Sequence, residues 1–128
     1  MMRFAIFLIA VTCSGNAVSQ QSFTAEEQIF AELYASYISK EMFVEICSEF
    51  EGDENYKNLF IQWTDMHKSD IAKGKNILTH HYSSHGVKID KVFKGKIDAE
   101  REYFNTANEH DKASVCKRLA SSISSDGN

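Results

Sequence analysis

The sequence of 128 residues contains no proline, one tryptophan and six glycines. Because proline is the residue that most strongly interrupts a helix, its absence allows long uninterrupted helices. The chain also has no excess of positive charge, because it contains 14 lysines and arginines but 18 aspartates and glutamates, which gives a net charge of −4. Nonspecific nucleic-acid binding needs a basic field, so we expect no nucleic-acid partner. The hydrophobic share of 43% is typical of a folded globular domain.

Sequence signatures of common catalytic sites are missing as well. The chain has no Gly-x-Ser-x-Gly motif, no glycine-rich phosphate loop and no legible Ser-His-Asp arrangement. Its carboxylates are distributed so evenly along the sequence that no two of them stand out as a candidate catalytic pair. We therefore predict that the protein is not an enzyme and holds no cofactor.

The first 19 residues have the three parts of a secretory signal peptide: a basic start at Arg3, an apolar run over residues 4–11 and small residues before Ser19. An apolar run of this length is far shorter than the roughly 20 residues of a membrane helix. We predict cleavage near Ser19, with Ala17 as the competing position, and export of residues 20–128 as one soluble helical domain with no membrane association. Lipoprotein processing at Cys13 is disfavoured by the bulk of Thr12.

Signal cleavage would remove Cys13 and leave Cys47 and Cys116. An even pair of cysteines in an exported chain favours a disulfide, although two buried thiols are the alternative. The two positions are 69 apart (116 minus 47). A loop of that length predicts a stabilisation of about 4 kcal/mol in the chain-entropy model.

Apolar residues recur at helical spacing in four segments. The first helix is predicted to start at Thr24, which forms a capping box with Glu27, and its apolar stripe begins at Ile29 and ends before Gly52. Asp53 is the predicted cap of the second helix, whose stripe includes Trp63 and Met66 and which stops at Gly86. The third helix is expected over about residues 87–107, and a short fourth helix follows a cap at Asn108 or Asp111.

These segments predict an all-α fold, a compact four-helix bundle-like domain. Both mature cysteines lie on apolar stripes, so a Cys47–Cys116 disulfide would join the end of the first helix to the fourth. Such a cross-link would secure the modest core of a small domain.

The charge is unevenly distributed along the chain. Residues 24–54 carry nine acids and a single base, Lys40, whereas residues 56–96 carry eight lysines and three acids. Glu41, Glu45 and Glu49 follow one another at four-residue steps, so they lie on one face of the first helix and repel each other. Either the lysine-rich helices neutralise them or a cationic partner does. We predict these three glutamates as a partner-binding site, with Glu26 and Glu27 as a weaker addition.

His80, His81 and His85 gather near the end of the second helix and are weak candidates for a metal site. No cysteine is near them and no acid lies between Asp70 and Asp90, so the ligand set is incomplete. Histidines in the last turn of a helix also interact favourably with its dipole, and we prefer this structural interpretation.

A predicted signal peptide, a small helical domain and the cysteine pair in EICSEF and ASVCKRLA give the chain an architecture that resembles small periplasmic immunity proteins. Bacteria make these proteins against their own type VI secretion effectors. The resemblance implies a periplasmic inhibitor that sterically blocks a cognate secreted toxin, a peptidoglycan hydrolase of muramidase type, and that can form a homodimer. The alternatives are a pH-responsive periplasmic chaperone and a metal- or haem-binding helical protein.

Overall fold

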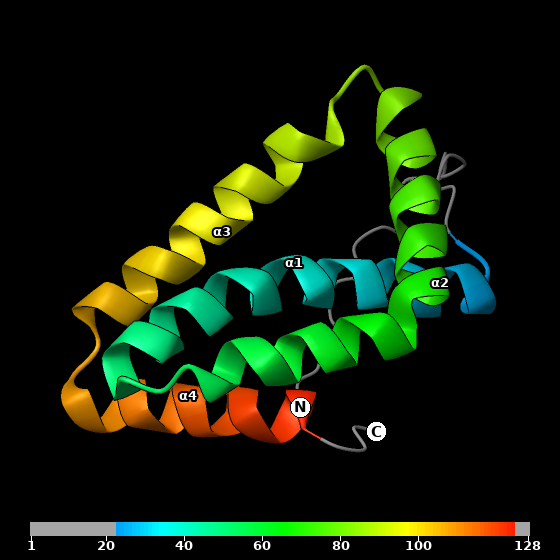
Figure 1. Cartoon of the computed structure of the whole chain (residues 1–128). Coiled ribbons are helices and arrows are strands. Elements are labelled where there is room, and N and C mark those ends of the chain that lie inside the picture. Colours follow the sequence, from blue (N-terminus) through cyan, green and yellow to red (C-terminus); the bar gives the residue numbers. More distant parts are fainter. Residues whose placement is uncertain (1–22, 125–128) are drawn as a thin grey trace.

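The computed structural model describes residues 23–124, which form four helices and no strand (Figure 1). The helices are α1 (Ala25–Glu51), α2 (Asn55–Ser83), α3 (Ile89–Thr106) and α4 (Glu109–Ile123). The predicted all-α, four-helix fold class is therefore confirmed. The predicted signal peptide, residues 1–19, lies outside the described residues. No helix within the described range is long and apolar enough to cross a bilayer.

Local sequence signals define both ends of α1. The Thr24 Oγ1 accepts the Glu27 backbone N–H at 3.0 Å, and Glu27 Oε1 accepts the Thr24 N–H at 3.1 Å. This is the capping box that the sequence predicts. At the other end Gly52 adopts a left-handed conformation with φ 65°, which glycine tolerates without steric cost.

The ends of α2 and α3 differ by one to three residues from the sequence prediction. The N-cap position of α2 is Glu54, not Asp53, although Asp53 Oδ1 still accepts the Asn55 N–H at 2.9 Å. The helix ends at Ser83, before the predicted stop at Gly86. Of the two candidate caps of α4, Asn108 is the cap, because its Oδ1 accepts the Asp111 N–H at 2.8 Å.

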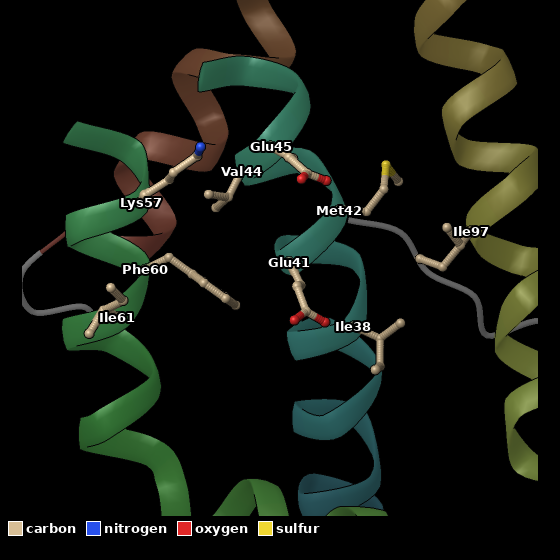
Figure 2. A pocket seen from close by; sticks show the side chains of 9 residues that line it. All are labelled: Ile38, Glu41, Met42, Val44, Glu45, Lys57, Phe60, Ile61 and Ile97. Carbon is tan, nitrogen blue, oxygen red and sulfur yellow. The ribbon is translucent and has the colours of Figure 1, made fainter. Parts of the chain in front are cut away.

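The two long helices α1 and α2 lie side by side and supply most of the core (Figure 1). Trp63 of α2 is 5% exposed and stacks on Phe60, with ring centroids 6.1 Å apart, and Phe60 stacks on Tyr37 of α1 at 5.7 Å. On one side the two helices leave a groove between them (Figure 2). The buried core residues with the lowest exposure are Val44, Cys47, Trp63, Phe104, Cys116 and Ile123.

Along its length α2 changes direction, so that its second half rises away from the layer formed by α1 and α4 (Figure 1). Gly74 lies in this second half and is buried against the backbone of α1 at Phe30. A Cβ atom at position 74 would overlap the Phe30 carbonyl oxygen and approach Tyr34 Cβ to 2.9 Å. The absence of a side chain therefore allows the two helices to cross closely here.

The third helix returns obliquely from the end of α2 to the start of α4 (Figure 1). Aromatic contacts attach it to α1 at two places. Phe93 packs edge-on against Tyr34 at 5.5 Å, and the buried Phe104 packs edge-on against Phe50 at 5.8 Å. Between them Lys96 Nζ donates to Ser39 Oγ of α1 at 3.0 Å.

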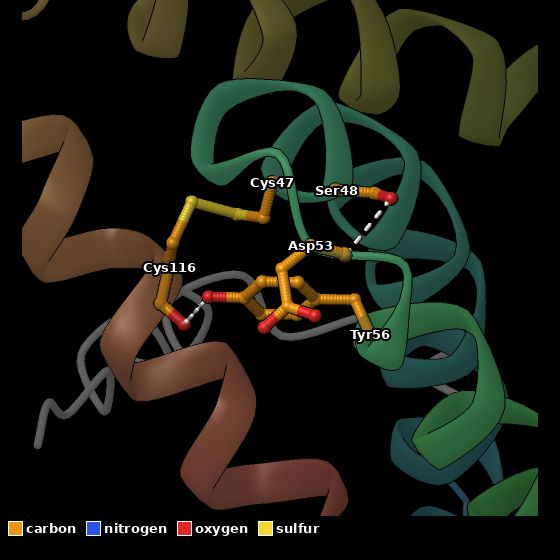
Figure 3. Close-up of a disulfide and its surroundings, with 5 residues drawn as sticks. All are labelled: Cys47, Ser48, Asp53, Tyr56 and Cys116. Carbon is orange, nitrogen blue, oxygen red and sulfur yellow. Dashed lines mark hydrogen bonds between the residues drawn. A yellow bond between two sulfur atoms is a disulfide. The ribbon is translucent and has the colours of Figure 1, made fainter.

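The predicted disulfide between Cys47 and Cys116 is present and joins α1 to α4 (Figure 3). Both cysteines are completely buried. The Tyr56 hydroxyl of α2 donates to the Cys116 carbonyl oxygen at 3.4 Å, and Ser48 Oγ donates to the Asp53 carbonyl oxygen at 3.2 Å. The cross-link thus lies where three helices meet.

Two residues of the predicted apolar stripes are not in the core. Ile29 is 64% exposed and Met66 is 63% exposed. Periodicity identifies the apolar side of a helix, but a residue on that side is buried only where another element covers it. In the described part of the chain no element covers these two positions.

We expect Gly74→Ala to lower the free energy of unfolding by about 1–3 kcal/mol, because the added methyl group must push α2 away from α1. Gly95→Ala is the matched control, since Gly95 is a helical glycine with open space where a Cβ atom would lie. That change should raise stability by about 0.5–1 kcal/mol through helix propensity. Urea denaturation followed by circular dichroism measures both. Equal effects at the two positions would contradict the proposed close helix crossing.

Replacing both cysteines with alanine should lower the free energy of unfolding by about 4 kcal/mol, because the unfolded chain regains the entropy of an open 69-residue loop. Denaturation of the wild-type protein with and without a reductant gives the same comparison with no mutation. A loss below about 1 kcal/mol in both experiments would mean that packing alone holds α4 in place.

Candidate functional site

The candidate site is the groove between α1 and α2, a hollow of about 480 Å³ that Ile97 of α3 borders (Figure 2). Most of its surface is apolar, with polar groups supplied by two carboxylates of α1 and one lysine of α2. Its lining residues are Ile38, Glu41, Met42, Val44, Glu45, Lys57, Phe60, Ile61 and Ile97.

Helical geometry brings Glu41 and Glu45 together, because residues four apart lie on the same side of a helix. Both residues are exposed and line the hollow, and their carboxylates lie in front of the α1 ribbon (Figure 2). Opposite them lie Phe60 and Ile61 of α2, and Ile61 is 59% exposed. The groove therefore offers two negative charges beside accessible apolar surface.

No direct ion pair neutralises these carboxylates within residues 23–124. The five ion pairs found there each join residues three or four apart in sequence, and none involves Glu41, Glu45 or Glu49. Lys57 lines the same groove, but its Nζ pairs with Glu54 at 3.6 Å. Of the two alternatives for balancing the acidic face, direct pairing with the lysine-rich helices is therefore not observed.

The five predicted binding glutamates fall into two groups. Glu49 is exposed one turn beyond Glu45, at the end of the groove but outside its lining. Glu26 and Glu27 lie in the first turn of α1, and a rise of 1.5 Å per residue puts Glu27 about 21 Å from Glu41 along the axis. Glu27 also has a structural task as a member of the capping box. The structure thus brings Glu41 and Glu45 together and separates Glu26 and Glu27 from them.

Sequence reasoning missed the α2 side of the groove, including Lys57 and Ile61. Phe60 is half-buried, packs against the core and also lines the groove. The signal that could identify these residues is the register of α2 against α1, which helical periodicity does not contain.

Two tyrosines of α1, Tyr34 and Tyr37, have raised pKa values. Burial raises the pKa of Tyr37, and the nearby Glu41 carboxylate raises it further because a tyrosinate would meet a like charge. Burial is also the largest cause of the raised pKa of Tyr34, with smaller contributions from Asp90, Tyr37 and Glu41.

The histidine cluster is organised by local contacts. The His81 ring lies 5.0 Å from the rings of both Phe23 and His85. His85 Nδ1 is 2.9 Å from the His81 carbonyl oxygen, and because a carbonyl can only accept, a hydrogen bond here requires the tautomer with the proton on Nδ1. Over residues 23–124, no group of three or more His, Cys, Asp or Glu side chains is placed to hold a metal ion. Within this range the weak metal candidates His80, His81 and His85 are therefore not brought together as a set of three ligands.

Comparison with protein-family models, with curated proteins and with solved structures finds no match for this chain.

Glu41→Gln should lower the pKa of Tyr37 towards its ordinary value of 10.0, because the like charge beside the phenol is removed. A raised pKa stabilises the fold below pH 10 and this contribution is lost as the pH rises through the folded-state value, so the substitution should also reduce the alkaline loss of stability. Ultraviolet absorbance of tyrosinate measures the titration. Glu49→Gln is the control, since Glu49 contributes to neither tyrosine shift. Identical titration curves for the two variants would contradict the assignment.

Proposed function

We propose that this protein is an exported inhibitor that binds a cationic protein partner through the α1–α2 groove. In the resemblance drawn from the sequence, the partner is a secreted peptidoglycan hydrolase of muramidase type and the inhibitor is its periplasmic immunity protein. Inhibition is steric: the acidic side of α1 occupies the substrate cleft of the hydrolase. The inhibitor itself performs no catalysis.

The observation that supports this proposal most directly is the pair of exposed carboxylates, Glu41 and Glu45, without an ion pair in the described chain and next to accessible apolar surface. Like charges four apart destabilise an isolated helix by about 0.2–0.5 kcal/mol, and a lysine or arginine of a partner would relieve that repulsion. Close charge pairs across protein interfaces can contribute about 1.5–7 kcal/mol of coupling.

The apolar residues beside the carboxylates give the partner a hydrophobic anchor point. Ile61 is 59% exposed and Phe60 is half-buried, so an aliphatic or aromatic side chain can pack on them. Stable interfaces cover about 800 Å² on each partner, which is more than the groove alone supplies. The contact surface therefore extends along α1 to Glu49.

A steric inhibitor must hold its binding surface rigidly, since ordering a mobile segment on binding costs affinity. The buried disulfide at Cys47 lies between Glu45 and Glu49 in sequence and fixes this end of α1 to α4. The stacked rings of Tyr37, Phe60 and Trp63 fix the middle of α1 to α2. Preorganisation of this kind favours the inhibitor interpretation.

The proposal is tested by using the tagged protein without residues 1–19 to capture partners from the source cells. We expect recovery of a secreted cell-wall hydrolase whose cleavage of purified peptidoglycan falls as the protein is added. Capture of a protein whose enzymatic activity is unaffected by saturating amounts of this protein would contradict inhibition.

The double substitution Glu41→Lys and Glu45→Lys should weaken binding to that hydrolase by at least about 100-fold, because two charge pairs become repulsive. The melting temperature should change little, since both side chains are exposed. Asp65→Lys with Glu102→Lys is the matched control, because it changes the net charge equally at exposed sites on α2 and α3. Equal weakening by both double variants would indicate only long-range attraction and would reject the groove as the contact surface.

A further inference from the structure

A second hollow, of about 280 Å³, lies between α1 and α4 and shares no residue with the α1–α2 groove. Its walls include two cations, Lys40 of α1 and Arg118 of α4, and the apolar side chains of Phe43 and Leu119. Pockets for small molecules usually measure about 300–1,000 Å³, so this hollow is slightly smaller than that range and suits a ligand of few atoms.

Of the two cations that line this hollow, Lys40 has the more unusual surroundings. Its side chain is half-buried, its Nζ lies 5.1 Å from the centre of the Trp63 ring, and it donates to Ser36 Oγ at 2.8 Å. No carboxylate within residues 23–124 pairs with it or with Arg118. Burial lowers the pKa of Lys40, because a charged ammonium group loses hydration there. A charge removed from water normally has an ionic partner, whereas in the described part of the chain the half-buried Lys40 ammonium contacts a hydroxyl group and an aromatic ring.

Lys40 and Ser36 have donor groups that a ligand in this hollow could use, whereas the hydroxyl groups of Ser39 and Ser122 already donate to Glu100 Oε1 and to the Leu119 carbonyl oxygen. An ammonium has three N–H groups, and one of those of Lys40 is used by Ser36. The Ser36 oxygen accepts that bond, which leaves its own O–H able to donate. The Glu100 carboxylate, which accepts from Ser39 of the lining at 2.9 Å, pairs with Lys96 at 2.6 Å, so its charge is already compensated.

We propose that this hollow binds a small organic monocarboxylate, whose carboxylate group meets Lys40, Ser36 and Arg118 and whose apolar body packs against Phe43 and Leu119. The donor set favours an anion, since ammonium and guanidinium groups form strong charge-assisted hydrogen bonds with carboxylates. The apolar walls favour a ligand with a short hydrocarbon part over an inorganic anion. This site is independent of the proposed inhibitor function, because the groove contributes none of its residues.

Trp63 provides a direct reporter for the test, because it is the single tryptophan of the chain. Hexanoate is the probe, hexanamide is the neutral analogue with the same hydrocarbon part, and inorganic phosphate is the anion without one. We expect hexanoate to change Trp63 fluorescence with saturation, as Lys40 moves towards the carboxylate. Hexanamide should bind at least about tenfold more weakly, because a hydrogen bond to a charged group is worth about 1.5–3 kcal/mol.

Variants measured by titration calorimetry separate a specific site from general charge attraction. Lys40→Met keeps the aliphatic stem beside Trp63 and should weaken hexanoate binding at least about tenfold, and Arg118→Gln, at an exposed position, should weaken it as well. Lys112→Met is the matched control, because Lys112 Nζ lies 5.6 Å above the Phe104 ring at another place on α4 and its removal should leave binding unchanged.

Three outcomes would overturn the proposal. The first is an absence of saturation by about 10 mM hexanoate, which corresponds to negligible affinity for a ligand of this size. The second is phosphate or hexanamide binding as tightly as hexanoate. The third is an equal loss of affinity in the Lys112→Met and Arg118→Gln variants. If Lys40→Met fails to fold, Arg118→Gln alone decides, since an exposed arginine without an ion pair in the described chain can be changed with little effect on stability.

Discussion

The buried junction around Cys47 and Cys116 is the constraint on which the rest of the structure depends. The disulfide joins the last turns of α1 to the middle of α4, and the Tyr56 hydroxyl connects the start of α2 to the same point. Three helices, α1, α2 and α4, therefore meet at this point. Because a domain of this size buries a limited apolar area, a covalent cross-link supplies stability that packing alone provides poorly.

From this junction, α1 extends as the central element of the fold and presents different chemistry on its different sides. Towards α2 it exposes Glu41 and Glu45 beside an apolar surface, and Lys40 lines the hollow between α1 and α4 together with Arg118. A helix turns by about 100° per residue, so neighbours in sequence such as Lys40 and Glu41 face different partners. One helix can in this way line two separate hollows, each with its own charged side chains.

The local features of the fold could be predicted from the sequence because they arise from short-range interactions. The capping box of Thr24 and Glu27, the left-handed Gly52 and the four apolar segments all depend on residues within a few positions of each other. The predictions were wrong where coverage by another element decides, as at Ile29 and Met66, which are exposed. They also missed Lys57 and Ile61, since the register between α1 and α2 determines what faces Glu41 across the groove.

The sequence by itself determined the helical class, the approximate helix ends, the cysteine pair and the placement of Glu41, Glu45 and Glu49 along one side of a helix. These properties follow from composition, spacing and helical periodicity. Only the tertiary structure decided that Gly74 allows α2 to cross α1 closely, that Glu41 and Glu45 lie beside Ile61, and that Lys40 lies over Trp63. Such contacts join residues far apart in sequence, and they depend on how the helices pack, which no single helix encodes.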